Sequence, residues 1–229
     1  MKPILCLLAV LLSPISWALT PFSAQYKMTW DTMITLTGDA TQTLTRDSDT
    51  WRMQQNAKAS IGSISETSVF RSNVAGDLIP LEFMRDTTVF GRTKSYQSRF
   101  NWNQNTANWN DDQVTLEAGV LDPLTLQLSL RQALNTGGSL SVKVLDRGRI
   151  RDYDFEHLGQ VELDTPAGTL SLVHLRYQKN DDRTTELWFD PSRDHLMVRL
   201  LAQNDKGYLE LLLTQASTHQ DAELTAAPQ

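Results

Sequence analysis

Alternation of apolar and polar residues is the feature that most constrains this chain. Between residues 22 and 30, Phe, Ala, Tyr, Met and Trp occupy the even positions, and polar residues occupy the odd ones. A period of two places the apolar side chains of an extended segment on one face. The same period recurs near residues 51–55, 96–102 and 140–144, with turn-forming residues between the segments. We therefore expect a meander of antiparallel strands joined by hairpins.

One segment departs from this period. Its apolar positions 121, 124, 128, 130, 133 and 134 approximate one face of a helix. Asp122 suits the N-cap, Pro123 suits the first helical position, and two glycines from Gly137 onward suit the C-terminus. These features predict a helix at about 122–135. The residues 124–130 also alternate with period two, so a strand is the competing interpretation.

The strands and the helix together define the expected fold class. A sheet of ten or more strands twists, and it must curl or split to cover its apolar face. The expected fold is mainly β, with a curved antiparallel sheet that forms a roll or a partly closed barrel, covered by the helix at about 122–135. Residues 19–216 are expected to form a single all-β domain, and the polar residues 217–229 are expected to be a disordered tail.

The first 18 residues have the pattern of a cleavable secretory signal peptide, 1–18. Lys2 precedes an apolar run over residues 4–12, and small residues lead to a cleavage position after Ala18. The run is shorter than the roughly 20 apolar residues that a membrane-spanning helix needs. Cys6, the only cysteine, follows only two residues of the apolar run, and most of the apolar core comes after it, whereas a lipidation cysteine would follow the core. We predict an exported, periplasmic mature chain without a thiol and without a membrane span.

The charge balance excludes some classes of partner. The formal net charge is −6, and it becomes −7 once Lys2 is removed with the leader, leaving 20 basic and 27 acidic residues. Nucleic acids and anionic membrane surfaces are bound through basic patches. We therefore expect no nucleic-acid partner, and the sequence leaves the oligomeric state open.

No residue pattern indicates catalysis. The four histidines, at positions 157, 174, 195 and 219, have no metal-binding spacing, and no nucleophile elbow of the form G-x-S-x-G is present. The carboxylate pairs Asp111-Asp112 and Asp181-Asp182 lie in polar clusters typical of turns. We predict that the protein is not an enzyme and has no metal and no cofactor, although a site assembled from distant residues stays open.

Aromatic residues are the candidate ligand contacts. Several of them fall on the apolar phase of their strands, where they would be core residues or would line a concavity. A curled sheet often encloses such a concavity, whereas a filled core is the alternative interpretation. The candidate lining residues are Tyr26, Trp30, Trp51, Phe100, Trp102 and Trp188.

Several motifs resemble those of a family of exported bacterial proteins known as DUF3108. They are Phe22-x-x-x-Tyr26, Ile79-Pro80-Leu81-Glu82-Phe83, Leu121-Asp122-Pro123-Leu124-Thr125, Phe155-x-x-x-Gly159, Thr165-Pro166-Ala167-Gly168-Thr169-Leu170, Thr185-Glu186-Leu187-Trp188-Phe189-Asp190 and Asp194-His195-Leu196-Met197-Val198-Arg199. The family usually has proline where this chain has Met197. The resemblance implies an all-β, roll-like periplasmic protein, and it implies no activity and no catalytic residues.

Three functional hypotheses follow. The first is a non-catalytic periplasmic envelope protein that binds an apolar or lipid-like ligand in the concave face of the sheet, with the helix as a lid. The second is a structural envelope protein that docks a partner protein through a sheet edge or the convex face. The third is a hydrolase of envelope polymers with an unrecognised site, which would need a serine, a histidine and a carboxylate in one cleft.

Overall fold

The computed structural model describes residues 19–110, 112–166 and 168–218. Strands make up most of this part of the chain, as the alternating pattern predicts. Thirteen strands form one antiparallel sheet, and three strands form a second, smaller sheet. The predicted signal peptide 1–18 and residues 219–229 of the predicted tail lie outside the described residues.

The large sheet is a meander whose strand order follows the chain except at its centre. There the last strand, β16, pairs with the first, β1. In spatial order its strands are β12 (Glu156–Thr165), β13 (Gly168–Asn180), β14 (Arg183–Asp190), β15 (Leu196–Asn204), β16 (Gly207–Thr218), β1 (Phe22–Asp31), β2 (Thr35–Asp47), β3 (Thr50–Ala59), β4 (Gly62–Ser72), β5 (Leu78–Val89), β6 (Arg92–Asn101), β7 (Thr106–Trp109) and β8 (Asp112–Thr115).

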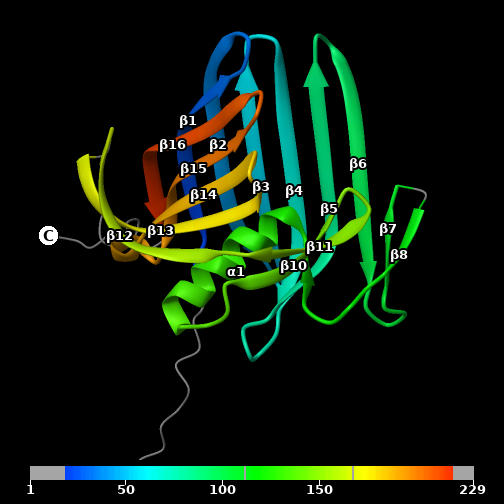
Figure 1. The fold of residues 1–229 in the computed structure, drawn as a ribbon. Helices are drawn as coiled ribbons and strands as arrows, with labels where there is room; N and C mark the ends of the chain where they lie inside the picture. Colours follow the sequence, from blue (N-terminus) through cyan, green and yellow to red (C-terminus); the bar gives the residue numbers. More distant parts are fainter. Residues whose placement is uncertain (1–18, 111, 167, 219–229) are drawn as a thin grey trace, which may run out of the picture.

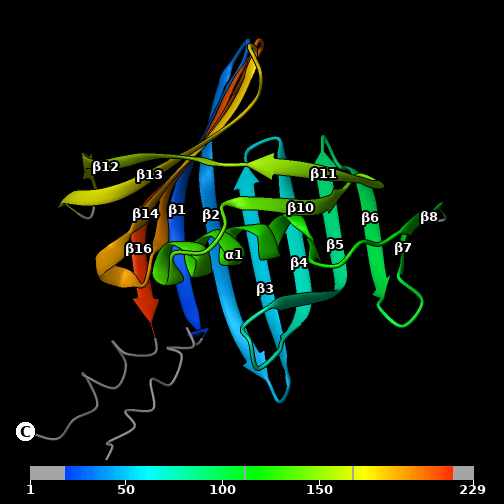
Figure 2. The ribbon, with the colours of Figure 1, turned by 60° about the horizontal axis from the view of Figure 1, so that its bottom comes forward.

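The chain crosses the concave side of this sheet between its two edges. It leaves the sheet after β8 at one edge and re-enters at β12 at the other. The crossing segment forms β9 (Val120–Leu121), helix α1 (Pro123–Thr136), β10 (Ser141–Asp146) and β11 (Arg149–Asp154). Figures 1 and 2 show α1 lying against the curved sheet, with β10 and β11 beside it. Because β8 and β12 do not pair, the sheet is an open half-barrel, and the predicted curved sheet with one helix is confirmed.

Helix α1 begins and ends where the sequence predicts. The Asp122 carboxylate accepts hydrogen bonds from the backbone N–H groups of Leu124 and Thr125, and the Thr125 hydroxyl accepts one from the Asp122 N–H. This reciprocal arrangement is a capping box. Gly137, at φ 70°, ends the helix in the left-handed region that glycine adopts without strain. The competing strand interpretation of residues 124–130 is wrong, because these caps satisfy the terminal backbone groups of a helix.

The helix packs its apolar face into the concave side of the sheet. Leu124, Leu128 and Leu130 are buried, and α1 contacts β3, β4 and β5 as well as β10. Phe70 of β4 and Phe83 of β5 are completely buried in the same core. Each such side chain stabilises the fold by roughly 1.5–3 kcal/mol relative to an exposed position. The helix is therefore part of the core in this half of the barrel.

The C-terminal strand is slightly longer than the predicted domain. In β16, Ser217 pairs with Ser23 and Thr218 pairs with Phe22. The strand thus extends two residues past the expected boundary at 216, because β1 offers backbone partners along its whole length.

A 3-10 turn, η1 (Pro191–Arg193), connects β14 to β15. Asp190 caps it by accepting a hydrogen bond from the Ser192 N–H. Asp194, in the left-handed region with φ 52°, ends it. Arg131 of α1 donates to the Asp194 carbonyl oxygen through Nε at 3.1 Å and Nη2 at 3.0 Å. This contact ties the helix to the end of η1.

Candidate ligand-binding site

Helix α1 fills only one half of the concave side. In Figure 1 the hairpins β1–β2, β3–β4 and β5–β6 extend well beyond α1, β10 and β11. The inward-facing side chains of these hairpin ends therefore have no helix packed against them. An uncovered concave sheet face is a common location for a ligand.

A chain of polar side chains runs across the sheet beside the helix. Register places Gln42 opposite Gln55, Gln55 opposite Glu66 and Glu66 opposite Arg85. Gln42 Nε2 donates to Gln127 Oε1 of α1 at 2.8 Å and to Gln55 Oε1 at 3.0 Å. Gln55 donates to Glu66 at 3.2 Å, and Arg85 Nε donates to Glu66 at 2.5 Å. These groups satisfy one another, as buried polar groups must.

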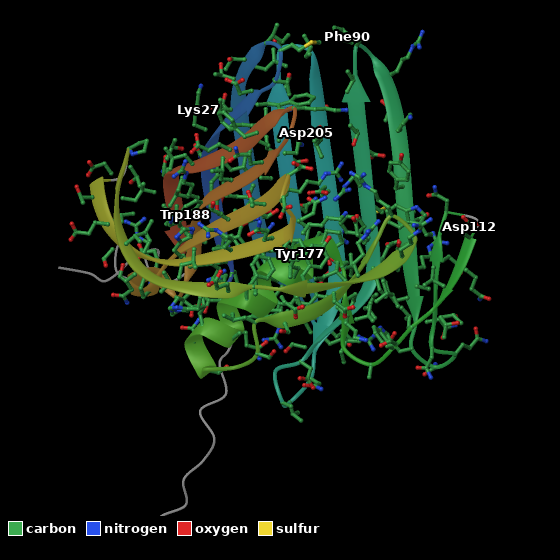
Figure 3. The ribbon with its side chains drawn as sticks, viewed as in Figure 1. Lys27, Phe90, Asp112, Tyr177, Trp188 and Asp205 are labelled. Atoms are coloured by element: carbon green, nitrogen blue, oxygen red, sulfur yellow. The ribbon has the colours of Figure 1, made fainter. Side chains whose placement is uncertain are left out.

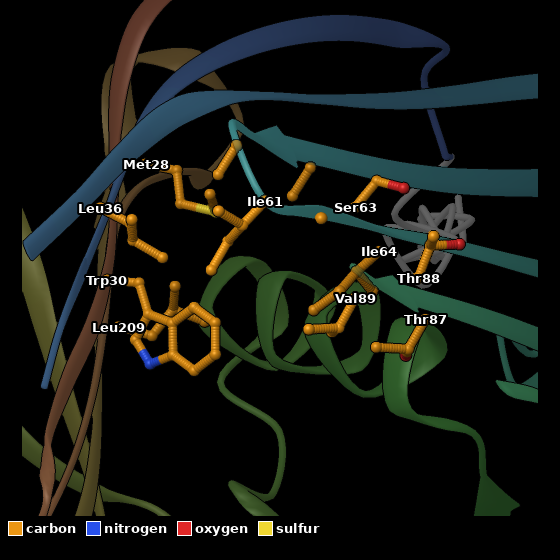
Figure 4. A pocket seen from close by; sticks show the side chains of 13 residues that line it. Met28, Trp30, Leu36, Ile61, Ser63, Ile64, Thr87, Thr88, Val89 and Leu209 are labelled. Carbon is orange, nitrogen blue, oxygen red and sulfur yellow. The ribbon is translucent and has the colours of Figure 1, made fainter. Parts of the chain in front are cut away.

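Beyond this polar row the inward-facing residues become small. Gly38 of β2 lies opposite Ala59 of β3, which lies opposite Gly62 of β4. One step nearer the polar row, Ala57 lies opposite Ile64. Because small side chains do not fill the concavity, a cavity of about 290 Å³ remains above them. It is lined by Met28, Trp30, Leu36, Ala57, Ala59, Ile61, Gly62, Ser63, Ile64, Thr87, Thr88, Val89 and Leu209 (Figure 4).

The lining of this apolar pocket is almost entirely carbon. Trp30 forms one wall and is 43% exposed, which is high for a tryptophan whose inward-facing neighbours in β1, Tyr26 and Met28, are buried. Ligand pockets span roughly 300–1,000 Å³, so this one is at the small end of the range. It suits one alkyl chain or one ring, and it offers few hydrogen-bonding groups to a polar ligand.

The turns around the pocket carry exposed apolar side chains. In the β1–β2 turn Met33 is 99% exposed and Ile34 is also exposed. In the β5–β6 turn Phe90, labelled at the end of its hairpin in Figure 3, is 78% exposed. The Phe90 N–H donates to the carbonyl oxygen of Ile61 in the β3–β4 turn at 3.0 Å, so the β5–β6 turn is joined to the β3–β4 turn between the two rim-bearing turns. We call Met33, Ile34 and Phe90 the apolar rim. These side chains lie at the same end of the sheet, and exposed apolar side chains that gather in one region commonly mark interaction sites.

Phe90 also has an unusual backbone conformation. Its φ is 48°, and the following Gly91 has φ 74°, so both central residues of the turn have positive φ. Such hairpin turns favour Asn, Asp or Gly at the first position, because a larger side chain is strained there. A bulky, exposed phenylalanine at this position is explained neither by the turn nor by packing.

The six aromatic residues predicted as ligand contacts lie in different surroundings. Trp30 lines the apolar pocket. Trp102 is partly buried, donates from its indole N–H to the Pro80 carbonyl oxygen at 2.7 Å, and borders a separate cavity of about 590 Å³ beside α1. The other four are buried in the core: Tyr26, Trp51, Phe100 and Trp188.

Contacts within the core account for two of these buried residues. The Tyr26 hydroxyl donates to the Met197 carbonyl oxygen at 2.9 Å, and burial raises the pKa of Tyr26. Trp188 is stacked against His174, with ring centroids 4.4 Å apart. A ligand contact by these two side chains stays a prediction, and Trp30 is the predicted residue that the structure places at the apolar pocket.

Sequence reasoning missed most of the pocket lining. The sequence does not single out Ala57, Ala59 and Gly62 as binding residues, because their side chains carry no functional group. The available signal was their position on the inward phase of β3 and β4, where large apolar residues are expected to fill a core.

The described residues contain no group of three or more His, Cys, Asp or Glu side chains that would hold a metal ion. In the same part of the chain, no helix has the length and hydropathy needed to cross a membrane. Of the histidines, His174 lies 2.5 Å from Glu186 across β13 and β14, and His195 lies 3.0 Å from Asn135. Both of these histidines thus contact a neighbouring side chain of the fold.

The fold and the pocket define the class of this protein: an open β half-barrel with a helix across its concave face and an apolar pocket at one end. The model of the family described as "Protein of unknown function (DUF3108)" matches residues 25–214. The chain therefore belongs to this family, and the predicted resemblance is confirmed. No curated protein matches the chain.

One of the matching solved structures supports the fold. A β-barrel-like protein of the DUF1849 domain from Brucella abortus has a TM-score of 0.60 at 12% identity, with 87% of this chain and 98% of that chain covered. A chain in the MucA/MucB complex of Pseudomonas aeruginosa has a TM-score of 0.34 at 17% identity, with 92% and 53% covered. A lipoprotein described as putative from Parabacteroides distasonis has a TM-score of 0.33 at 11% identity, with 87% and 96% covered. Only the first is similar enough to support the fold, and none bears on function.

Proposed function

We propose that this protein is a non-catalytic binding protein of the bacterial cell envelope, located in the periplasm, that holds an apolar or lipid-like ligand in the apolar pocket. The observation that carries the proposal is the pocket of about 290 Å³, which lies next to a well-packed core and is lined almost entirely by carbon. Filling this space with apolar atoms would remove apolar surface from water, which is favourable by roughly 25 cal/mol per Å².

Three further features support the proposal. The amino-terminal pattern of Lys2 and an apolar run is typical of exported proteins. The apolar rim of Met33, Ile34 and Phe90 stands at the end of the sheet where the pocket lies, so an apolar ligand would meet apolar side chains on entry. Helix α1 covers the other half of the concave face and lines no part of this pocket, so it leaves this half open to a ligand and is not a lid over it.

Ligand binding is tested with the mature protein purified from the periplasm. N-phenyl-1-naphthylamine, a neutral probe that fluoresces in apolar surroundings, is titrated into wild type and into Ala57→Phe, which places a ring in the pocket. Ala75→Phe makes the same change in the exposed loop between β4 and β5 and is the control. We expect saturable fluorescence with wild type and Ala75→Phe, and at least a 10-fold weaker response with Ala57→Phe.

The outcome depends on the folded state of the variants, so far-UV circular dichroism and thermal unfolding accompany the titration. Equal binding by wild type and a folded Ala57→Phe variant would contradict the pocket as the site. Native mass spectrometry with organic extraction of the same preparation then identifies any ligand carried from the cell.

Docking of a partner protein is a second candidate function, and the apolar rim is the observation that favours it. A photo-crosslinking amino acid at position 33 or 90, in wild type and in Ala57→Phe, separates the two functions. A discrete protein adduct that forms in both backgrounds would support docking independent of the pocket.

A further inference from the structure

A second cavity, of about 640 Å³, adjoins the apolar pocket. Trp30 and Leu209 line both cavities. The sheet register explains why the two are continuous: one cross-strand row runs from β13 to β2 through Tyr177, Thr185, Ala202, Leu209, Trp30 and Leu36. Each member of the row lies opposite the next, so the floor of one cavity passes directly into the other.

The two cavities differ in chemistry. Polar atoms make up nearly half of the exposed lining of the second cavity, and almost none of the first. Four basic side chains line the second cavity, brought together from three separate turns: Arg147 between β10 and β11, Lys179 and Arg183 around the β13–β14 turn, and Lys206 between β15 and β16. We call these four the basic cluster.

The basic cluster forms no ion pairs within the described part of the chain. None of its four side chains forms an ion pair with another described residue, although thirteen such pairs occur among those residues. Two carboxylates also line the cavity. Asp146 lies 4.0 Å from Arg85 and 3.9 Å from Arg151, so it already pairs with two arginines outside the basic cluster. Asp205 is the other carboxylate of the lining. The four basic side chains thus outnumber the two carboxylates of the lining, while Asp181 and Asp182 of the same β13–β14 turn line a different cavity.

Arg147 adds an independent observation. Its φ is 50°, and Gly148 follows with φ 73°, so Arg147 occupies a left-handed turn position that favours Asn, Asp or Gly. Strained backbone positions of this kind cost about 1–3 kcal/mol and cluster at binding sites. The turn projects a guanidinium group at the cavity instead of a residue that would relieve the strain.

We propose that the ligand is an anionic amphiphile, with its apolar part in the apolar pocket beside Trp30 and its carboxylate or phosphate head group against the basic cluster. This inference rests on the proposed function and specifies its ligand class. Arginine and lysine attract such head groups, and a cavity with low-dielectric walls strengthens the attraction. Trp30, 43% exposed between the two cavities, contacts the junction of head group and chain.

The test compares two probes that differ only in charge: cis-parinaric acid and its methyl ester, both fluorescent, at pH 8. The readout is the ratio of their affinities in wild type, in Arg147→Gln/Arg183→Gln, and in Arg92→Gln/Lys94→Gln. The last variant removes two exposed basic residues of β6 that line neither cavity. We expect the cluster variant to lower the acid-to-ester ratio roughly 3- to 10-fold, as two partly exposed charge interactions would. The β6 variant should leave the ratio unchanged.

The outcomes distinguish two claims: that the apolar pocket binds the ligand, and that the basic cluster binds its head group. If both probes bind wild type and the ratio is the same in all three proteins, the anionic head group is wrong while the pocket remains the site. An equal fall in the ratio in both variants would also overturn the head-group site, because it would reflect net charge alone. If neither probe binds, both proposals fail. Displacement of bound cis-parinaric acid by oleate or by lysophosphatidate then shows whether a carboxylate or a phosphate head group is preferred.

Discussion

Ser68 Oγ donates a 2.6 Å hydrogen bond to Asp122 Oδ2, joining strand β4 to the N-cap of helix α1 across 54 positions of the chain. The same carboxylate accepts from two backbone N–H groups of the first helical turn through its other oxygen. Asp122 is completely buried, so a single side chain both starts the helix and fixes that start against the sheet.

The Asp122 carboxyl makes stability depend on pH. Burial raises the pKa of Asp122 from 3.8 to about 6, against the opposing effect of the hydrogen bonds from Ser68, Thr125 and Leu124. The folded protein thus holds this proton more tightly than the unfolded chain. The contribution of Asp122 to the free energy of unfolding is therefore greatest below about pH 4, falls as the pH rises to about 6, and is constant above.

Asp122→Asn removes this titration while keeping the shape of the side chain. A pKa rise of about two units corresponds to about 3 kcal/mol. We expect the free energy of unfolding of the variant, minus that of wild type, to increase by up to about 3 kcal/mol between pH 4 and pH 7. Urea unfolding at several pH values measures this difference, and a difference that does not change with pH would contradict the role of Asp122.

Arg131 is expected to contribute strongly to stability. It is buried, donates twice to the Asp194 carbonyl oxygen, and lies 4.9 Å from the centre of the Phe22 ring. Losing hydrogen bonds from a buried charged group costs roughly 1.5–3 kcal/mol, and not the larger cost of a fully buried pair, because the Asp194 side chain is 34% exposed and water can reach it. We expect Arg131→Met to lower the free energy of unfolding by this amount in denaturant titrations.

Arg71→Met is the matched control for that prediction. Arg71 pairs with Asp49 at 3.3 Å, but both side chains are mostly exposed. Exposed ion pairs contribute about 0–1 kcal/mol to the free energy of unfolding. A loss for Arg131→Met no larger than that for Arg71→Met would show that the Arg131 contacts do not hold the helix in place.

Phe90 is expected to lower the free energy of unfolding relative to a residue that suits this turn. Its φ of 48° is strained for phenylalanine, and the side chain is too exposed to gain packing energy in return. Phe90→Asn supplies the residue that this turn favours before Gly91 and should stabilise the protein by roughly 0.5–1 kcal/mol. Thermal unfolding measures the gain, and Phe90→Leu, which keeps the strain, should show none. A less stable Phe90→Asn variant would mean that the ring packs in solution.

Gly38 is expected to be required for the shape of the pocket floor. A Cβ atom at this position would lie 2.0 Å from the Lys58 carbonyl oxygen and 3.0 Å from the end of the Met28 side chain. Gly38→Ala must therefore push β2 away from β3, which should cost about 1–3 kcal/mol and weaken binding of N-phenyl-1-naphthylamine. Gly91→Ala is the control, because no atom lies within 4 Å of a Cβ there and its φ of 74° is the sole source of strain. Unchanged binding by Gly38→Ala would show that the pocket does not depend on this contact.

Local chemistry in the sequence determined the elements of the fold. Alternation from Phe22 to Trp30 gave β1, and Asp122, Pro123 and Gly137 gave the ends of α1 within one residue. These predictions succeed because strand faces and helix caps depend on residues only a few positions apart. The curved sheet also followed, because so many strands cannot bury an apolar face while flat.

The site was decided by the tertiary structure. Trp30 and Tyr26 share the inward phase of β1, yet Tyr26 is in the core and Trp30 lines a pocket, because α1 covers only one end of the concave face. Sequence periodicity distinguishes inside from outside, but it does not determine which inward positions a distant helix will cover. The basic cluster shows the same limit: Arg147 and Arg183 lie in hairpins of two different sheets, and only the packing of the small sheet against the large one, as where Tyr153 contacts Tyr177, brings their charges to one cavity.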